Sequence, residues 1–141
     1  MIKGNMKRIN IFLLVCIVLF ITITSNSFAA YKRETITVGK NQVWNTRPTI
    51  SRSGAFKTVV ARVFSVYPSG GGPDLFTTIQ TQLVSSSGVE LTYIYNLNEN
   101  NSSSTTMQIK EGYLGYRNVN FRFRGNNSSY SARADVEYNS R

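Results

Sequence analysis

Alternation of apolar and polar residues with a period of two is the feature that most limits what this chain can fold into. From residue 34 onward, short runs rich in Val, Ile, Thr, Tyr and Phe are separated by clusters of Gly, Asn, Ser and Pro. No window shows the 3.6-residue apolar spacing of an amphipathic helix. The predicted strands span residues 34–38, 42–45, 57–67, 75–84, 91–97, 105–110, 119–124 and 130–138. Short strands with frequent turns are typical of an all-β fold.

The alternation also assigns faces, because successive side chains of a strand point to opposite sides. Val119, Phe121 and Phe123 are predicted to face the core. For the last strand the predicted inward residues are Tyr130, Ala132, Ala134, Val136 and Tyr138. Residues 58–66 are apolar on both faces except at Arg62 and Ser65, which indicates a central strand. We predict an antiparallel two-sheet sandwich of about eight strands, with a small closed barrel as the alternative.

The first 29 residues have the pattern of a secretory signal peptide. Lys3, Lys7 and Arg8 precede an apolar run over residues 11–21, and small residues precede a predicted cut after Ala29. The run is too short for a spanning helix, which needs about 20 apolar residues. We therefore expect a secreted, bacterial protein in which residues 30–141 form a single domain with no transmembrane span.

Removal of this segment changes the composition of the working protein. The only cysteine, Cys16, leaves with it, so the remaining chain can form no disulfide. Three of the sixteen basic residues leave and all seven acids stay, so the net charge falls from +9 to +6. A surplus of this size favours anionic partners.

The chemistry available to residues 30–141 is narrow. The chain has no histidine, and after processing no cysteine, which removes the commonest general base, the thiol nucleophile and the usual zinc ligands. The glycine run at 70–72 lacks the Lys-Ser/Thr pair and the helix of a phosphate-binding loop. We predict no catalytic residue, no metal site and no cofactor, and therefore a protein that is not an enzyme.

Four arginines near the C-terminus form the strongest candidate binding surface. Arg122 and Arg124 are predicted on the outward face of one strand and Arg133 on the outward face of the next, with residues 125–129 closing a hairpin between them. Arg117 stands just before. Such a cationic face can bind an anionic cell-wall polymer or an anionic lipid surface. It can equally be a solvated strand face that discourages edge-to-edge aggregation. Nucleic acid is the least favoured partner, since the protein is exported and the surface lacks a reading motif.

The aromatic residues divide into two predicted groups. Tyr93 and Tyr95 share a face with Leu91 and Leu97, so we expect them in the core. Tyr113 and Tyr116 lie in a turn that contains Gly112 and Gly115 and are predicted to be exposed. Trp44 is predicted either to join the exposed pair or to fill one end of the sandwich.

These observations predict a non-enzymatic binding protein that acts at the cell envelope or on a target surface through a cationic face. The alternative is a bacteriocin-like or membrane-damaging β toxin. Residues 76–84 have an alternating pattern with Ser/Thr-type polar residues, and residues 98–106 are polar, as in the amphipathic hairpins of β-pore-forming proteins. An enzyme of another type is the third and least favoured possibility. No motif identifies the ligand.

Overall fold

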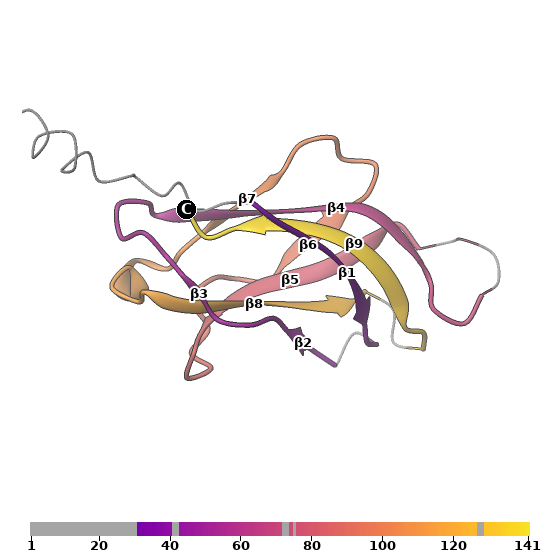
Figure 1. Cartoon of the computed structure of the whole chain (residues 1–141), viewed down its shortest axis with the longest axis horizontal. Helices are drawn as coiled ribbons and strands as arrows, with labels where there is room; N and C mark the ends of the chain where they lie inside the picture. Colours follow the sequence, from indigo (N-terminus) through magenta and orange to yellow (C-terminus); the bar gives the residue numbers. More distant parts are fainter. Residues whose placement is uncertain (1–30, 41–42, 72–73, 75, 127–128) are drawn as a thin grey trace, which may run out of the picture.

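Two facing sheets form the structure, a computed structural model that describes residues 31–40, 43–71, 74, 76–126 and 129–141 (Figure 1). The predicted signal peptide lies outside the described residues, as does Leu75 at the start of a predicted strand. The described strands are β1 (Lys32–Val38), β2 (Asn45–Thr46), β3 (Ile50–Ser51), β4 (Thr58–Pro68), β5 (Thr78–Ser85), β6 (Tyr95–Asn98), β7 (Thr105–Gln108), β8 (Asn118–Gly125) and β9 (Ala132–Asn139). A short 3-10 helix, η1 (Glu111–Tyr113), follows β7.

All strand pairs are antiparallel. Sheet A has the order β1-β9-β4-β7, and sheet B has the order β2-β8-β5-β6, with β3 also paired to β8. The two sheets do not close into a barrel. The predicted all-β sandwich is confirmed, and the barrel alternative is wrong. Among the described residues, no helix has the length and apolar character needed to cross a membrane.

The core lies between the sheets and follows the predicted alternation closely. Val119, Phe121 and Phe123 of β8 are fully buried, as are Ala134 and Val136 of β9. The ring of Tyr138 packs against those of Phe121 and Phe123, with centroids 4.7 and 5.7 Å apart. The predicted central strand is also confirmed, because β4 pairs with β9 on one side and β7 on the other.

The predicted C-terminal hairpin is wrong. β8 pairs with β5 and with the short strands β2 and β3 in sheet B, whereas β9 pairs with β1 and β4 in sheet A. The chain between them therefore crosses from one sheet to the other. At its end β8 meets the end of β1, where the Gly125 N–H donates to Gly39 O at 2.6 Å and a Cβ on Gly125 would overlap that oxygen. Tyr130 lies in the crossing and is 62% exposed, not inward.

The predicted strand over residues 91–97 is shorter in the structure. Thr92 turns inward and is buried, because its hydroxyl accepts a hydrogen bond from Leu83 N at 3.0 Å and its carbonyl accepts one from Gln82 Nε2. The alternation therefore breaks, and β6 begins only at Tyr95. Tyr93 is 70% exposed, so its predicted place in the core is wrong, while Tyr95 is half-buried.

Candidate anion-binding end of the sandwich

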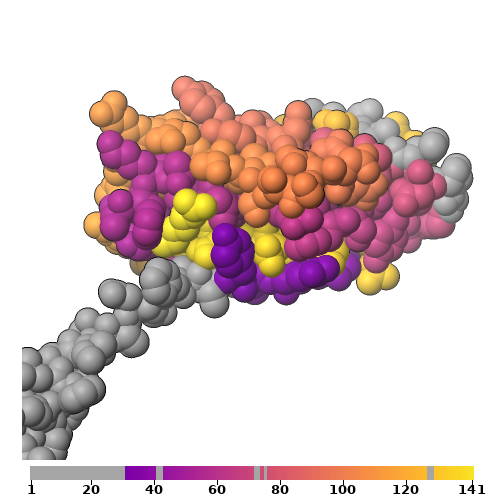
Figure 2. All heavy atoms as spheres, turned by 90° about the horizontal axis from the view of Figure 1, so that it is seen from above, coloured from indigo at the N-terminus to yellow at the C-terminus, as the bar shows by residue number. Residues whose placement is uncertain are grey.

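Three segments far apart in the sequence meet at one end of the sandwich, where magenta, orange and yellow atoms lie together at the left (Figure 1 and Figure 2). The loop 52–57, the loop 109–117 and the last residues of the chain are joined by backbone hydrogen bonds, with Arg52 N donating to Arg117 O and Ser53 N to Arg141 O, both at 2.7 Å. We call this region the basic end. Its cationic side chains are those of Arg52, Lys57, Lys110, Arg117 and Arg141.

Arg52 holds the two loops of the basic end together. Its side chain is only 3% exposed, and it donates exclusively to backbone carbonyls among the described residues. Nε donates to Tyr116 O at 3.1 Å, Nη1 donates to Ser53 O at 3.1 Å and to Phe56 O at 2.6 Å, and Nη2 donates to Leu114 O. A guanidinium group suits this role because its donors are fixed in a plane and always charged.

The positive charge of the basic end is almost uncompensated. Glu111 is its one acidic side chain, and none of its five cations makes a salt bridge within the residues that the structure describes. Burial lowers the pKa of Arg52, and the nearby charge of Arg117 lowers it further. The guanidinium of Arg117 lies directly over Gly54, where any side chain would collide with it.

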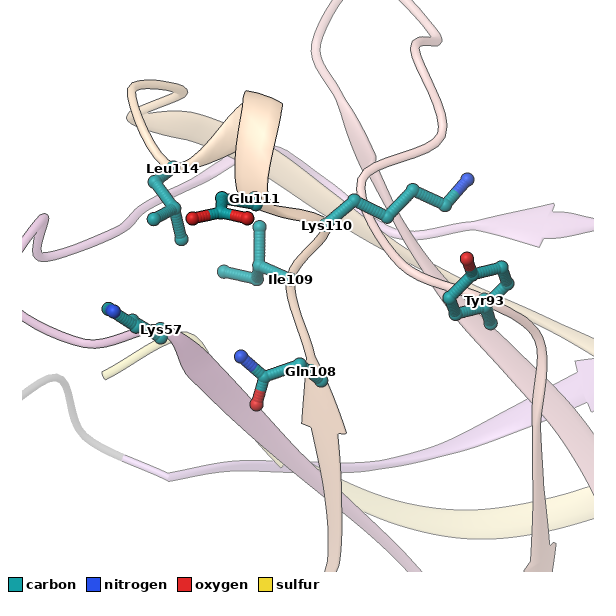
Figure 3. Close-up of a pocket in the computed structure, with 7 residues that line it drawn as sticks. All are labelled: Lys57, Tyr93, Gln108, Ile109, Lys110, Glu111 and Leu114. Atoms are coloured by element: carbon teal, nitrogen blue, oxygen red, sulfur yellow. The ribbon is translucent and has the colours of Figure 1, made fainter.

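A shallow pocket of about 460 Å³ opens beside these loops (Figure 3). Its lining residues are Lys57, Tyr93, Gln108, Ile109, Lys110, Glu111 and Leu114. Lys110 extends from the end of β7 toward Tyr93, with Nζ 5.1 Å from the ring centroid, while Lys57 and Glu111 lie on the other side of Ile109. The pocket thus offers two ammonium groups, one carboxylate and an exposed aromatic ring.

Apolar side chains are exposed next to these cations. Phe56 precedes Lys57 and is 45% exposed, and Ile94 follows Tyr93 and is 46% exposed. Exposed apolar groups interleaved with lysine are a combination suited to a surface that is both anionic and partly apolar.

The predicted site residues divide among three places. Arg117, Tyr113 and Tyr116 lie at the basic end. The two tyrosine rings form a tilted pair with centroids 5.9 Å apart, but both side chains are half-buried and pack against the core, so their predicted exposure is wrong. They support the loop beneath Arg117.

Arg122, Arg124 and Trp44 lie on the outer face of sheet B. The guanidinium carbons of the two arginines are 4.4 and 4.3 Å from the centroid of the half-buried Trp44 ring. Arg122 also makes a salt bridge with Glu90 at 2.7 Å. Trp44 is therefore stacked against arginines on the outside of the sandwich and does not fill its end.

Arg133 lies on the outer face of sheet A, near the ring of Tyr67 at 5.8 Å. Because β8 and β9 belong to different sheets, Arg133 faces away from Arg122 and Arg124. The four predicted arginines do not form one surface.

Lys57, Lys110 and Arg52 were not among the predicted site residues. Lys57 begins one predicted strand and Lys110 ends another, and neither has another cation next to it in the sequence. The antiparallel register of β4 and β7, in which Thr58 is opposite Gln108, brings the two lysines to one pocket. Only the strand pairing carries this information.

A second charged cluster is fully paired. Glu34 of β1 accepts hydrogen bonds from Arg47 Nε at 2.9 Å and from the Tyr138 hydroxyl at 2.5 Å. Burial alone would raise the pKa of Glu34, but the hydrogen bonds from Arg47 and Tyr138 outweigh it and hold this pKa below its usual value. Burial, followed by the hydrogen bond to Glu34, raises the pKa of Tyr138 well above its usual value. The cluster neutralises Arg47 and is not a free anion site.

No protein-family model matches the chain, and no curated protein matches it. Over the described ranges, no three His, Cys, Asp or Glu side chains come together in a group that could hold a metal ion. The distribution of charge and of exposed side chains is therefore the main indication of function.

Proposed function

We propose that this protein is an exported, non-enzymatic binding protein that attaches to an anionic surface of a cell envelope through its basic end. The single observation that carries the proposal is the gathering of five cationic side chains and one acidic side chain at this end, without a salt bridge in the described structure. Uncompensated like charges destabilise a fold by repelling one another. A partner that supplies the missing negative charge would relieve this repulsion.

The ligand chemistry that fits best is a row of closely spaced phosphate groups. Lysine ammonium groups bind phosphate as mobile point charges, and a guanidinium such as that of Arg117 binds it through two parallel donors. Anionic lipid surfaces and phosphate-bearing wall polymers share this chemistry. The exposed Phe56 and Tyr93 beside the lysines add contacts that are favourable at a lipid headgroup layer.

Attachment is favoured over membrane damage because of the place of β5 in the fold. The predicted pore-forming segment 76–84 lies largely in β5, which is hydrogen-bonded to β8 on one side and β6 on the other. Ile79 and Leu83 of β5 are fully buried. Releasing this strand into a membrane hairpin requires breaking sheet B.

The test is co-sedimentation of the purified protein with vesicles containing an anionic phospholipid, with neutral phosphatidylcholine vesicles and with an insoluble glycerol-phosphate polymer. We expect retention by one or both anionic materials, none by the neutral vesicles, and release as salt rises, because salt screens these interactions. Each cation near such a surface contributes about 1 kcal/mol, so Lys57→Glu/Lys110→Glu/Arg117→Glu should lower affinity about 100-fold or more.

A matched control reverses three exposed or half-buried cations elsewhere, with Lys32→Glu/Lys40→Glu/Arg133→Glu. Both triple variants have the same net charge. If binding takes place at the basic end, the control variant should keep most of its affinity. Equal losses in the two variants would show attraction by net charge alone and overturn the assignment of the site. Release of an encapsulated dye at binding concentrations would overturn attachment in favour of membrane damage.

A further inference from the structure

A continuous row of polar side chains crosses the outer face of sheet B. Arg124 of β8 donates from Nε to Gln80 Oε1 of β5 at 2.8 Å, and Gln80 Nε2 donates to Asn96 Oδ1 of β6 at 3.3 Å. The strand register places Gln80 opposite both Arg124 and Asn96. On the other side of Arg124, the Trp44 ring packs against its guanidinium at 4.3 Å. The row spans about 14 Å, three strand spacings.

The row has more hydrogen-bond donors than acceptors. Both acceptor oxygens, Gln80 Oε1 and Asn96 Oδ1, are already used within it. The terminal nitrogens of Arg124 have no hydrogen-bond or salt-bridge partner in the described chain, and the Nδ2 of Asn96 is likewise unused there. Because the bonds within the row hold these donors in place, they are preorganised to meet acceptor oxygens of a ligand.

A similar arrangement on sheet A differs, because one of its two arginines is paired with a carboxylate. There the Phe64 ring lies against the guanidinium groups of Arg33 and Arg62, at 3.8 and 4.3 Å. Arg33 makes a two-pronged ion pair with Asp135, with Nη2 to Oδ2 at 2.6 Å, and Arg62 is opposite Glu137 in the register. On sheet A, Arg33 thus has its own carboxylate, whereas Arg62 makes no salt bridge within the described residues and its buried Nε has no hydrogen-bond partner there. On sheet B, Arg122 has Glu90 and Arg124 has none.

We propose that this row is a second binding site, for a polysaccharide that carries carboxylate groups. The planar guanidinium of Arg124 matches a carboxylate through two parallel hydrogen bonds. Gln80 and Asn96 continue the site along the direction of an extended chain and present amide groups to its hydroxyls. Trp44 is a positioning residue that holds Arg124 through the cation–π contact. The site is independent of the basic end and does not rest on the function proposed above.

The chain offers its own reporter for this site, since Trp44 is its only tryptophan. The experiment titrates the protein with an oligogalacturonate and, separately, with a neutral oligosaccharide of the same length, and follows tryptophan fluorescence. We expect a saturable change with the uronate and none with the neutral sugar. Arg124→Gln should weaken uronate binding at least 10-fold, because a hydrogen bond between charged groups contributes about 1.5–3 kcal/mol. Asn96→Ala should weaken it less.

Three controls keep the result interpretable. Arg124→Lys keeps the positive charge but loses the planar pair of donors. It should therefore bind uronate more tightly than Arg124→Gln but more weakly than the wild type. Arg133→Gln removes an arginine of sheet A and should leave uronate binding unchanged. The basic-end variant Lys57→Glu/Lys110→Glu/Arg117→Glu should also bind uronate normally, whether or not it still binds anionic vesicles.

Two results would overturn the proposal. One is uronate binding that survives Arg124→Gln or that is matched by the neutral sugar. The other is uronate binding that disappears in the basic-end variant, which would assign all anion binding to that end.

Discussion

Cationic side chains are paired or stacked on the strands but largely unpaired at the basic end. On the strands Arg33 and Arg122 are each paired with a carboxylate, and Arg62 and Arg124 are stacked on aromatic rings. Arg47, between β2 and β3, is also paired with a carboxylate. At the basic end Lys57 and Arg117 have neither a carboxylate nor a stacking ring in the described structure. The paired and stacked cations on the strands therefore contribute to folding, whereas Lys57 and Arg117 at the basic end oppose it and are available to a ligand.

Loss of Arg52 should have the largest effect, because this one cation at the basic end is structural. Arg52→Leu removes the donors of four backbone carbonyls and should lower the free energy of unfolding by about 3 kcal/mol. Arg52→Lys should lose less, since it keeps a charge and some donors. Urea denaturation measures both variants, and a change below 1 kcal/mol for Arg52→Leu would show that the loops do not depend on it.

Breaking a paired cation should have the next largest effect and should depend on pH. Glu34→Gln removes the negative charge and one of the two acceptor oxygens that serve Arg47 and Tyr138, and it should cost about 2 kcal/mol at neutral pH. The folded-state pKa of Glu34 is lowered. Its contribution to the free energy of unfolding is therefore complete above its unfolded pKa, about 4.3, and is lost as pH falls through the folded-state pKa.

The wild-type protein should therefore lose more stability than Glu34→Gln between about pH 5 and the acid unfolding range. Tyr138 has the opposite sign, since its pKa is raised: its contribution is present below about pH 10 and is lost only as pH rises further. Parallel acid curves for wild type and Glu34→Gln would show that this cluster is not the acid-sensitive pair.

The smallest predicted effect is a change in the free energy of unfolding that has opposite signs when a cation is removed from a strand and from the basic end. Arg122→Gln, on a strand, should lower the free energy of unfolding by about 1 kcal/mol because a stacked and paired cation is lost. Lys57→Gln, at the basic end, should raise it by about 0.3 kcal/mol because repulsion is relieved. Thermal unfolding at low and high salt separates the cases, since the gain for Lys57→Gln should vanish as salt screens the repulsion.

The strand faces show which parts of the structure the alternation of apolar and polar residues could predict. It correctly predicted the inward sets of β8 and of residues 132–138, and the central place of β4. It failed at Tyr93, because the buried hydroxyl of Thr92 finds partners inside and interrupts the alternation. It also failed at Tyr130, which lies in a chain crossing that has no strand period to follow.

The chain by itself determined the all-β class, the sandwich and most of its core, because burying apolar side chains on one face is a local property of each strand. The arrangement of charge was decided only by tertiary structure. Alternation predicts the face that a residue occupies but not the neighbouring strand. The pattern of β8 and β9 is therefore compatible both with a hairpin and with strands in separate sheets. The register of β4 with β7 and the hydrogen bonds of Arg52 then create the basic end from residues up to about ninety positions apart.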